Sequence, residues 1–393
     1  MESSSHMRIK RGLSQKTRRK ITYSVLFLIL LIIILIIKPD KKEIVEEHKI
    51  KIGFMGPLTA DLPEWGESTK NGALLAIEEI NNEGGINSIK LELIIEDDQC
   101  NPKFSTNAAT KLITIDKVLA IVGTVCSSAF LGAAPIAEEN KVVMIGSAPS
   151  SPEITKSGDY IFRIWPSDVY QARVMADHIK NKEKLDRIAL MYTNSDYNIA
   201  LKNAFKEEFE KLGGKILAEE TYEQYSKDFR TQLIKIRERN PDALYIIPYS
   251  EGGILLRQIG QMAVPIRVFA SETIASKEIL ADARNFAEGV VYATPKHDKE
   301  DKIIKEFLNK YKQRFGKDPP IPAAAGNAYD SIKLIAEAVK KYGESSDAIK
   351  QYLYEIKDYS GAGGKLTIDN NGDPIKEFEL MIIKSGNFVK LEE

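Results

Sequence analysis

Apolar runs and turn residues alternate along most of the chain in a rhythm of strand, helix and strand. Short β-branched runs with the alternation of a strand are each followed by a turn and by apolar residues at helical spacing. We expect strands in two series, at 50–54, 91–95, 118–122 and 142–145, and then at 188–192, 216–222, 243–247 and 266–270. Helices are expected between them, at 67–82, from 102, from 127, and at 197–212, 229–239 and 252–262. Two such series predict the α/β class with two doubly wound parallel-sheet lobes.

The remaining residues are expected to complete both lobes. A strand at 290–294 is predicted to return the chain to the first lobe, followed by helices at 300–315 and 323–342 and hairpin-like strands over 365–392. The chain then crosses three times between the lobes, which predicts a three-stranded hinge beside a cleft. The expected boundaries are 49–167 with 295–375 for lobe 1, and 168–294 with 376–393 for lobe 2.

An uncharged apolar run, ITYSVLFLILLIIILII, occupies residues 21–37 behind a basic segment. Its length lies at the short end of the roughly 17 to 25 residues that span a bilayer, and basic flanks stay in the cytoplasm. We therefore expect a single-pass anchor at 21–37 in the cell membrane, with the body on the extracellular side. Residues 1–20 are then a tag remnant and a basic cytoplasmic tail, and 38–48 a linker. The alternative is a cleaved secretory signal, although no small-residue cleavage site follows the run.

Composition places the chain among globular proteins. It has 393 residues, of which 43% are hydrophobic and 28% charged. Residues 1–48 hold ten Lys/Arg and five Asp/Glu, so the formal charge of -1 for the whole chain leaves about -6 for the rest. An acidic body without a basic stripe gives no sign of nucleic-acid binding.

Motifs for catalysis are missing from the sequence. There is no GxSxG, HExxH or GxxxxGK[ST] pattern, and no cluster of Cys and His at metal-ligand spacing. The four histidines, His6, His48, His178 and His297, do not pair with Cys126 as base and nucleophile. We therefore expect a protein that is not an enzyme and that carries no cofactor and no metal.

Hydroxyl side chains follow two strands of the first predicted lobe. Ser127 opens a helix after the strand at 118–122, and Ser147, Ser150 and Ser151 follow the next strand. Parallel strands deliver these loops to the same sheet edge, where open α/β sheets bind ligands. We expect Ser127 at the N-cap of its helix, where free N–H groups attract an anion such as a carboxylate. Alternatively, Ser127 only caps the helix and the other serines only make turns.

Further candidates come from both lobes. Glu272 follows the strand at 266–270 in the second lobe, and across a cleft from the serines it would suit the ammonium of a zwitterion. An exposed loop glutamate is the alternative. Trp65, Tyr197 and Tyr249 stand in predicted loops or at the ends of elements, where aromatic residues line pockets or simply pack against the core or rim.

Cys100 and Cys126 are the two cysteines of the chain. Each follows a predicted strand at the same sheet edge, and a pair in an extracellular protein is more often bridged than free. A disulfide here would be worth about 3 kcal/mol. Two unrelated buried thiols are the alternative.

Several segments together carry a resemblance to a known family. In order and spacing, the chain from about Lys49 onwards resembles type I periplasmic binding proteins of the branched-chain amino-acid (leucine/isoleucine/valine) group, the soluble receptors of ABC importers. The segments are IKIGFMGPLTADLPEWG, NGALLAIEEINNEGGI, LIIEDDQCNP, VGTVCSSA, VMIGSAPSSPEI, YNIALKNAFKEEFEKLGGKI, FASETI and NAYDSI.

The resemblance implies roles for the candidate residues at the two poles of an amino acid. Ser127 and Ser150, with the backbone of Ala148, would hold the ligand carboxylate and help to hold its ammonium, and Glu272 would pair with the ammonium. The family often has Thr where this chain has Ser150. The serine keeps the hydroxyl of the threonine but lacks its methyl group.

The resemblance also implies that Tyr197 closes against the ligand, that Trp65 lies near the ligand side chain and that Tyr249 is a second-lobe aromatic of the pocket. Asn198 stands where Gly is usual after the tyrosine, which puts the loop at Tyr197 in question. The disulfide of the family falls on Cys100 and Cys126.

The expected function is that of an extracellular, membrane-anchored solute-binding component of an ABC importer. It would capture an amino acid, aliphatic or branched-chain, in the interlobe cleft by hinge closure and deliver it to the permease, acting as a monomer. The alternatives are binding of a non-amino-acid carboxylate, an amide or an aromatic acid, and a sensor ectodomain acting through a partner chain.

Overall fold

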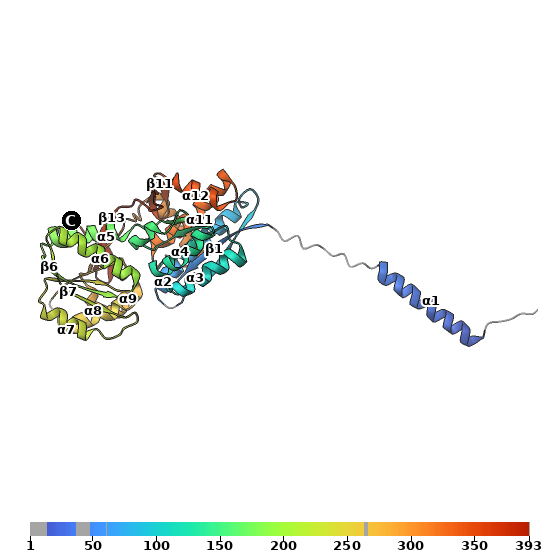
Figure 1. Cartoon of the computed structure of the whole chain (residues 1–393), viewed down its shortest axis with the longest axis horizontal. Helices are drawn as coiled ribbons and strands as arrows, with labels where there is room; N and C mark the ends of the chain where they lie inside the picture. Colours follow the sequence, from blue (N-terminus) through green and yellow to red (C-terminus); the bar gives the residue numbers. More distant parts are fainter. Residues whose placement is uncertain (1–13, 37–47, 60, 263–265, 393) are drawn as a thin grey trace, which may run out of the picture. The chain divides into compact units, whose positions relative to one another are not determined.

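The computed structural model of the protein describes residues 14–36, 48–59, 61–262 and 266–392 (Figure 1). The chain divides into two compact units, Met1–Glu47 and His48–Glu393. In the first unit the structure describes one helix, α1 (Gln15–Ile36). None of the helices in the described part of the chain is long and apolar enough to cross a membrane, so the predicted transmembrane anchor is not supported. Residues 1–13 of the predicted tail and 38–47 of the predicted linker lie outside the described residues.

The second unit contains a five-stranded sheet whose neighbours are all parallel, in the order β2-β1-β3-β4-β5. Its strands are β1 (Lys49–Gly56), β2 (Lys90–Asp97), β3 (Ala120–Gly123), β4 (Val143–Gly146) and β5 (Ile161–Arg163). The helices packed around it are α2 (Pro63–Asn82), α3 (Pro102–Lys111), α4 (Ser127–Glu139), α10 (Lys302–Phe315), α11 (Pro322–Tyr342) and α12 (Ser346–Tyr354). We call this sheet and its helices the first lobe.

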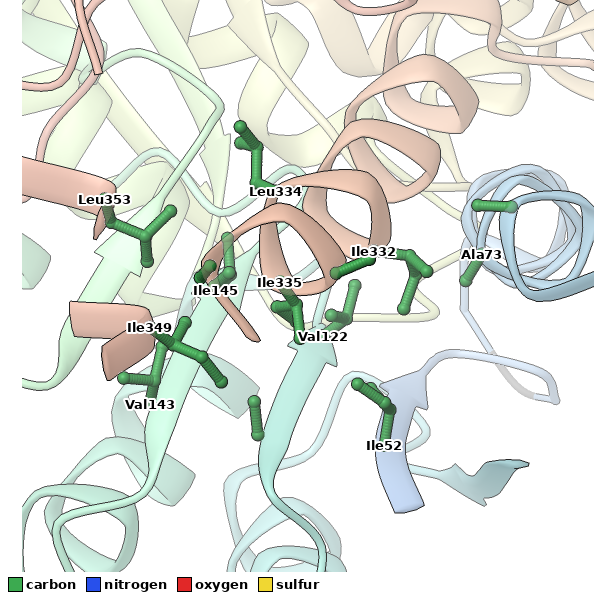
Figure 2. Packing of buried hydrophobic residues seen from close by; sticks show 14 of the residues in the cluster. Ile52, Ala73, Val122, Val143, Ile145, Ile332, Leu334, Ile335, Ile349 and Leu353 are labelled. Carbon is green, nitrogen blue, oxygen red and sulfur yellow. The ribbon is translucent and has the colours of Figure 1, made fainter. Parts of the chain in front are cut away.

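Strand alternation sends apolar side chains to both faces of the first sheet. Figure 2 shows Val122, Val143 and Ile145 against Ile335 of α11 and Ile349 of α12. The intervening strand residues, among them Ile121 and Met144, pack instead with α3 and α4. Because both faces are covered, β3 and β4 are apolar and buried along their whole length, as parallel strands usually are.

A seven-stranded sheet forms the other half of the unit, in the order β14-β13-β10-β9-β8-β6-β7. Its strands are β6 (Arg187–Thr193), β7 (Lys215–Tyr222), β8 (Ala243–Ile247), β9 (Arg267–Ala270), β10 (Val291–Pro295), β13 (Phe378–Lys384) and β14 (Asn387–Lys390). The strands from β7 to β10 are parallel, and β13 and β14 are antiparallel additions. Its helices are α5 (Asp168–Asp177), α6 (Asp196–Lys211), α7 (Arg230–Glu238), α8 (Gly252–Gln261) and α9 (Lys277–Ala283). We call this sheet and its helices the second lobe.

Short elements complete the unit. A small antiparallel pair joins β11 (Tyr359–Gly361) to β12 (Gly364–Leu366). The short helical turns are η1 (Leu112–Asp116), η2 (Pro152–Lys156), η3 (His178–Lys182), η4 (Glu272–Ile274) and η5 (Arg284–Ala287).

The chain leaves the first sheet after β5, returns after β10 and crosses again before β13. The predicted strand at 290–294 is β10, which pairs with β9 and β13 in the second lobe before the chain returns to the first. Around residues 370–373 the chain turns back on itself in the hairpin-like way predicted, although without extended strands: Ile368 and Pro374 form an isolated antiparallel bridge, and the Ile375 N–H donates to the Thr367 carbonyl oxygen at 2.9 Å. The turn at 385–387 does join β13 to β14. The predicted lobe boundaries at 167, 294 and 375 stay a prediction.

Two glycines allow α2 to pack closely on its neighbours. A Cβ on Gly72 would lie 2.1 Å from the carbonyl oxygen of Ala325 in α11, and one on Gly66 would lie 1.8 Å from the carbonyl oxygen of Pro57. Real Cβ atoms do not approach backbone oxygens this closely. The first turn of α2 is thereby held against the loop after β1.

Candidate functional site

A pocket lies between the ends of the two sheets. Its lining comes from loops that follow β1, β3 and β4 in the first lobe and β6, β8 and β9 in the second. This is the carboxyl edge of both parallel sheets, where ligands of open α/β folds bind. The lining residues are Leu62, Trp65, Val125, Cys126, Ser127, Ala148, Ser150, Tyr197, Tyr249, Glu272 and Thr273. The structure thus brings all seven sequence-predicted ligand residues into one pocket and adds Leu62, Val125, Cys126 and Thr273.

Ser127 ties two loops of the first lobe together. Its Oγ accepts hydrogen bonds from the backbone N–H groups of Ser150 and Ser151, each at 3.1 Å. The N-cap of α4 is Cys126 and not Ser127, so the predicted capping role is wrong, because the hydroxyl oxygen is committed to the neighbouring loop. A hydroxyl has two acceptor lone pairs and one proton. With both lone pairs engaged, the hydroxyl of Ser127 can still donate its proton.

The loop after β4 is fixed by contacts from distant segments. The Asn327 side chain of α11 donates to the carbonyl oxygen of Ser147 at 2.9 Å. The backbone N–H of Asp168 donates to the carbonyl oxygen of Ser150 at 2.8 Å. These bonds hold the loop in place before any ligand binds, which lowers the entropy that binding must overcome.

A disulfide joins Cys100 and Cys126, with their Cα atoms 5.2 Å apart. It connects the loop after β2 to the start of α4. The predicted bridge is confirmed, and Cys126 also lines the pocket.

Glu272 is the first residue of η4, directly after β9, and only 4% of its surface is exposed. Its Oε2 has no hydrogen-bond partner among the residues that the structure describes. Burial, and then the nearby Asp168 carboxylate, raise the pKa of Glu272 well above its ordinary value. The exposed-loop alternative is therefore wrong, and a cation placed here would relieve an unfavourable burial.

Asp168 is a second buried carboxylate, and the sequence analysis did not predict it. It opens α5 with 1% of its surface exposed, and burial raises its pKa to about 7. The guanidinium of Arg163 lowers that pKa but is itself bound to Asp373, at 2.7 Å between Nε and Oδ1. Glu272 and Asp168 are therefore two buried acidic groups whose pKa values are both raised, chiefly by burial.

Aromatic rings enclose the pocket from both lobes. Tyr197 and Tyr249 stack with their ring centroids 5.7 Å apart, and Trp65 packs edge-on against Trp165 at 5.5 Å. Burial and the neighbouring Glu272 charge raise the pKa of Tyr197, so its hydroxyl stays protonated. That hydroxyl has no partner within the described residues.

Asn198 does not displace Tyr197 from the pocket. Its side-chain amide donates to the carbonyl oxygen of Ile247 at 2.6 Å, and its Oδ1 accepts a hydrogen bond from the hydroxyl of Ser195. The asparagine therefore pins the start of α6 to the end of β8, which places Tyr197 beside Tyr249.

Comparison with known proteins assigns the chain to a family. A family model described as periplasmic binding protein matches residues 49–387. The chain belongs to this family. Its relatives are substrate-binding proteins and not enzymes, which confirms the prediction of a solute-binding protein without catalytic function.

Three similar proteins carry informative descriptions. The Leucine-, isoleucine-, valine-, threonine-, and alanine-binding protein of Pseudomonas aeruginosa is 31% identical over 335 residues, covering 85% of this chain and 89% of that protein. The branched-chain amino acid transporter substrate binding protein LivJ from Streptococcus pneumoniae, in complex with isoleucine, has a TM-score of 0.80 at 27% identity, over 87% of this chain and 98% of that one. A solute binding protein of an ABC transporter from Rhodopseudomonas palustris, in complex with 3,4-dihydroxy benzoic acid, has a TM-score of 0.77 at 26% identity. The match covers 87% of this chain and 96% of that one.

The residues around the pocket of this binding protein that the sequence analysis missed stand where the local sequence pattern is weak. Leu62 and Val125 are single apolar residues next to turns, and Asp168 and Trp165 follow β5, a strand of three residues. A strand this short has no periodic signal. A polar residue at the start of a helix normally indicates only a cap, so nothing local set Asp168 apart.

Proposed function

We propose that this binding protein captures an aliphatic α-amino acid as a zwitterion between its two lobes and delivers it to the permease of an ABC importer. One observation carries the proposal: the buried carboxylate of Glu272, whose Oε2 has no hydrogen-bond partner among the described residues, lies in the same pocket as the hydroxyl of Ser127. One pole of the pocket donates hydrogen bonds and the other is acidic. An α-amino acid has the complementary pair of groups.

The carboxylate pole is built on the first lobe. Ser127 offers its hydroxyl proton, and Ser150 lines the pocket beside it. Ser127 is also the first residue of α4, where the positive end of the helix dipole favours an anion. The N–H of Ala148 donates to the carbonyl oxygen of Thr124 at 3.4 Å, so Ala148 offers the ligand its carbonyl, a group suited to an ammonium.

The ammonium pole is built on Glu272. An ammonium there would pair with a carboxylate already removed from water, so the desolvation cost is met in the fold and not on binding. The protonated hydroxyl of Tyr197 lies in the same pocket and is close enough to feel the charge of Glu272. A ligand without an ammonium would leave Glu272 unpaired.

The side-chain region of the pocket is apolar. Leu62, Trp65, Val125 and Cys126, the last in a disulfide, line it. Each methylene buried against such a surface contributes about 0.8 kcal/mol. This composition favours leucine, isoleucine and valine over polar amino acids, and the names of the relatives in Pseudomonas and Streptococcus point the same way.

Closure links capture to delivery. Because the ligand would touch both lobes only when they are together, binding would shift an equilibrium between open and closed forms toward the closed one. A permease that recognises the closed form would then receive loaded protein. The Cys100–Cys126 disulfide supports action in an oxidising compartment outside the cytoplasm.

Calorimetry on Glu272→Ala tests the proposal. Wild type is expected to bind leucine, isoleucine and valine, and not 4-methylpentanoate, which lacks the ammonium. Glu272→Ala is expected to abolish binding of neutral amino acids, because their ammonium would lose its counter-charge. Glu278→Ala, an exposed glutamate six residues on, is the matched control. Unchanged affinity in Glu272→Ala, or equal affinity for 4-methylpentanoate, would refute the assignment.

A second candidate ligand class is the aromatic acids. The three aromatic residues of the pocket, Trp65, Tyr197 and Tyr249, and the dihydroxybenzoate complex of the Rhodopseudomonas relative support it. Benzoate and 3,4-dihydroxybenzoate belong in the same titration series. Binding of these acids with Glu272→Ala unimpaired would favour this class over amino acids.

A further inference from the structure

The start of α2 presents two different faces to its surroundings. Leu62 and Trp65, three residues apart, line the pocket. Asp61 and Glu64, also three residues apart, contact the second lobe instead. Asp61 and Leu62 immediately precede α2, with Leu62 as its N-cap in the left-handed region, and Glu64 and Trp65 lie in its first turn. Neighbouring residues of this short segment therefore face either the pocket or the second lobe.

Asp61 is completely buried, and both of its carboxylate oxygens are used. Oδ2 accepts a hydrogen bond from the side-chain amide of Gln224, and Oδ1 accepts one from the hydroxyl of Ser250. Gln224 follows β7 and Ser250 follows β8, so both donors belong to the second lobe. A buried carboxylate of the first lobe is thus held by hydrogen-bond donors from across the pocket.

Glu64 makes a second contact of the same kind. Its Oε2 accepts a hydrogen bond from the hydroxyl of Ser276 at 2.6 Å. Ser276 is the N-cap of α9, and its Oγ accepts from the N–H groups of Glu278 and Ile279 at 3.2 and 3.4 Å. The serine is therefore fixed on the second lobe before it donates to Glu64.

We propose that Asp61 and Glu64 are positioning residues that latch the two lobes over an occupied pocket and set the rate at which the ligand leaves. The inference rests on the proposed function, since it needs a ligand enclosed between the lobes. If the lobes separate, Asp61 and Glu64 exchange their partners on the second lobe for water. Hydrogen bonds to charged groups are stronger than neutral ones, so their loss resists opening.

The latch acts on rate and leaves selectivity alone. Neither Asp61 nor Glu64 lines the pocket, whereas Leu62 and Trp65 on the same turn do. Holding this turn down keeps those two apolar side chains against the ligand. Weakening it is expected to raise the dissociation rate for every ligand by the same factor, with the order of preference unchanged.

Stopped-flow fluorescence on the full chain tests the latch, with leucine as ligand and Trp65 and Trp165 as reporters. Asp61→Asn, which keeps the volume of the side chain, is expected to release leucine about 10-fold faster with a nearly unchanged association rate. Gln224→Ala, made on the other side of the same bond, is expected to have a smaller effect in the same direction. Glu67→Ala is the control, because its partner Lys317 lies in the first lobe.

A double variant separates the latch from general damage. Because Asp61→Ala removes the partner of Ser250, adding Ser250→Ala is expected to cause no further loss. Wild-type dissociation rates in Asp61→Asn and Gln224→Ala would overturn the proposal, as would additive effects in the double variant.

Leucine binding by wild type distinguishes failure of the latch from failure of the proposed function. If wild type binds leucine and releases it as fast as Asp61→Asn and Gln224→Ala do, the latch fails and the proposed function stands. If wild type binds no amino acid, the proposed function fails, and the latch, which needs an enclosed ligand, fails with it.

Discussion

Replacing Glu272 by Gln should have opposite effects on the stability of the ligand-free protein and on the binding of amino acids. Glu272 is 4% exposed, its Oε2 has no partner in the part of the chain that the structure describes, and burial together with Asp168 raises its pKa. The same features that prepare the residue for an ammonium make it costly to keep in the folded protein. We expect Glu272→Gln to be more stable than wild type without ligand and much weaker in binding amino acids.

The stability gain should depend on pH, with a definite sign. Because the pKa of Glu272 in the folded state lies above its unfolded value, the folded protein holds the proton more tightly than the unfolded chain does. Its contribution to stability is fully present below the unfolded pKa and is lost as pH rises through the folded pKa, by about 1.4 kcal/mol for each unit between the two. Gln has no proton to lose. The advantage of Glu272→Gln should therefore grow between pH 5 and pH 8.

The loss of binding follows from removing one partner of a buried ion pair, which typically costs about 3 to 5 kcal/mol. At 1.4 kcal/mol for each tenfold change, this raises Kd by about 100-fold or more. Urea unfolding of the ligand-free protein at pH 5 and pH 8 measures the first effect, and calorimetry with leucine measures the second. Glu278→Gln, on the exposed side of α9, controls for charge alone. A Glu272→Gln variant that is less stable than wild type at pH 8, or that binds leucine equally well, would refute this reasoning.

Three further changes probe the pocket and its support. Asp168→Asn should gain stability over wild type as pH rises from 5 to 8, since burial raises the pKa of Asp168 to about 7; urea unfolding at both pH values checks this, and a constant difference would contradict it. Reducing Cys100–Cys126, 26 residues apart, should cost about 3.5 kcal/mol and lower Tm; identical melting curves with and without dithiothreitol would contradict this. Gly72→Ala should cost about 1 to 3 kcal/mol, because the new methyl would press on the carbonyl of Ala325; a urea midpoint equal to that of wild type would show that the helices can separate freely.

The sequence predicted the parallel sheets well because buried strands are short, apolar and followed by clear turns. The predicted strand at 243–247 coincides with β8, and those at 118–122 and 142–145 differ from β3 and β4 by one or two residues. Prediction failed where local pattern is weak. β5 has only three residues and was not predicted. At the hairpin-like turn of 370–373 the Asp369 carboxylate accepts from the N–H groups of Asn371 and Asp373, and the predicted strands shrink to one antiparallel bridge, Ile368 with Pro374.

The candidate site could be predicted as a set of residues but not as a set of contacts. Parallel topology brings loops after β3, β4 and β9 to sheet edges, which was enough to group Ser127, Ser150 and Glu272. The bond from Ser150 N–H to Ser127 Oγ joins residues 23 apart, and the Asp61–Ser250 bond joins residues 189 apart. Such partners depend on how lobes and loops meet in space, which periodicity along the chain does not carry.

The serine side of the pocket and Glu272 should contribute differently to the affinity for a ligand. In the loop after β4, the Ser127 Oγ accepts from the N–H groups of Ser150 and Ser151 and the Ser147 carbonyl accepts from Asn327, whereas the buried Ser147 hydroxyl has no partner in the described residues. The Oε2 atom of Glu272 is also buried without a partner there. A neutral hydroxyl left without a partner costs less free energy than a charged group does. An unsatisfied carboxylate gains more, since the ligand removes a cost that the protein already carries. Selection among ligands should therefore depend more on the group that meets Glu272 than on the group that meets the serines, and amines without a carboxylate should retain more affinity than acids without an amine.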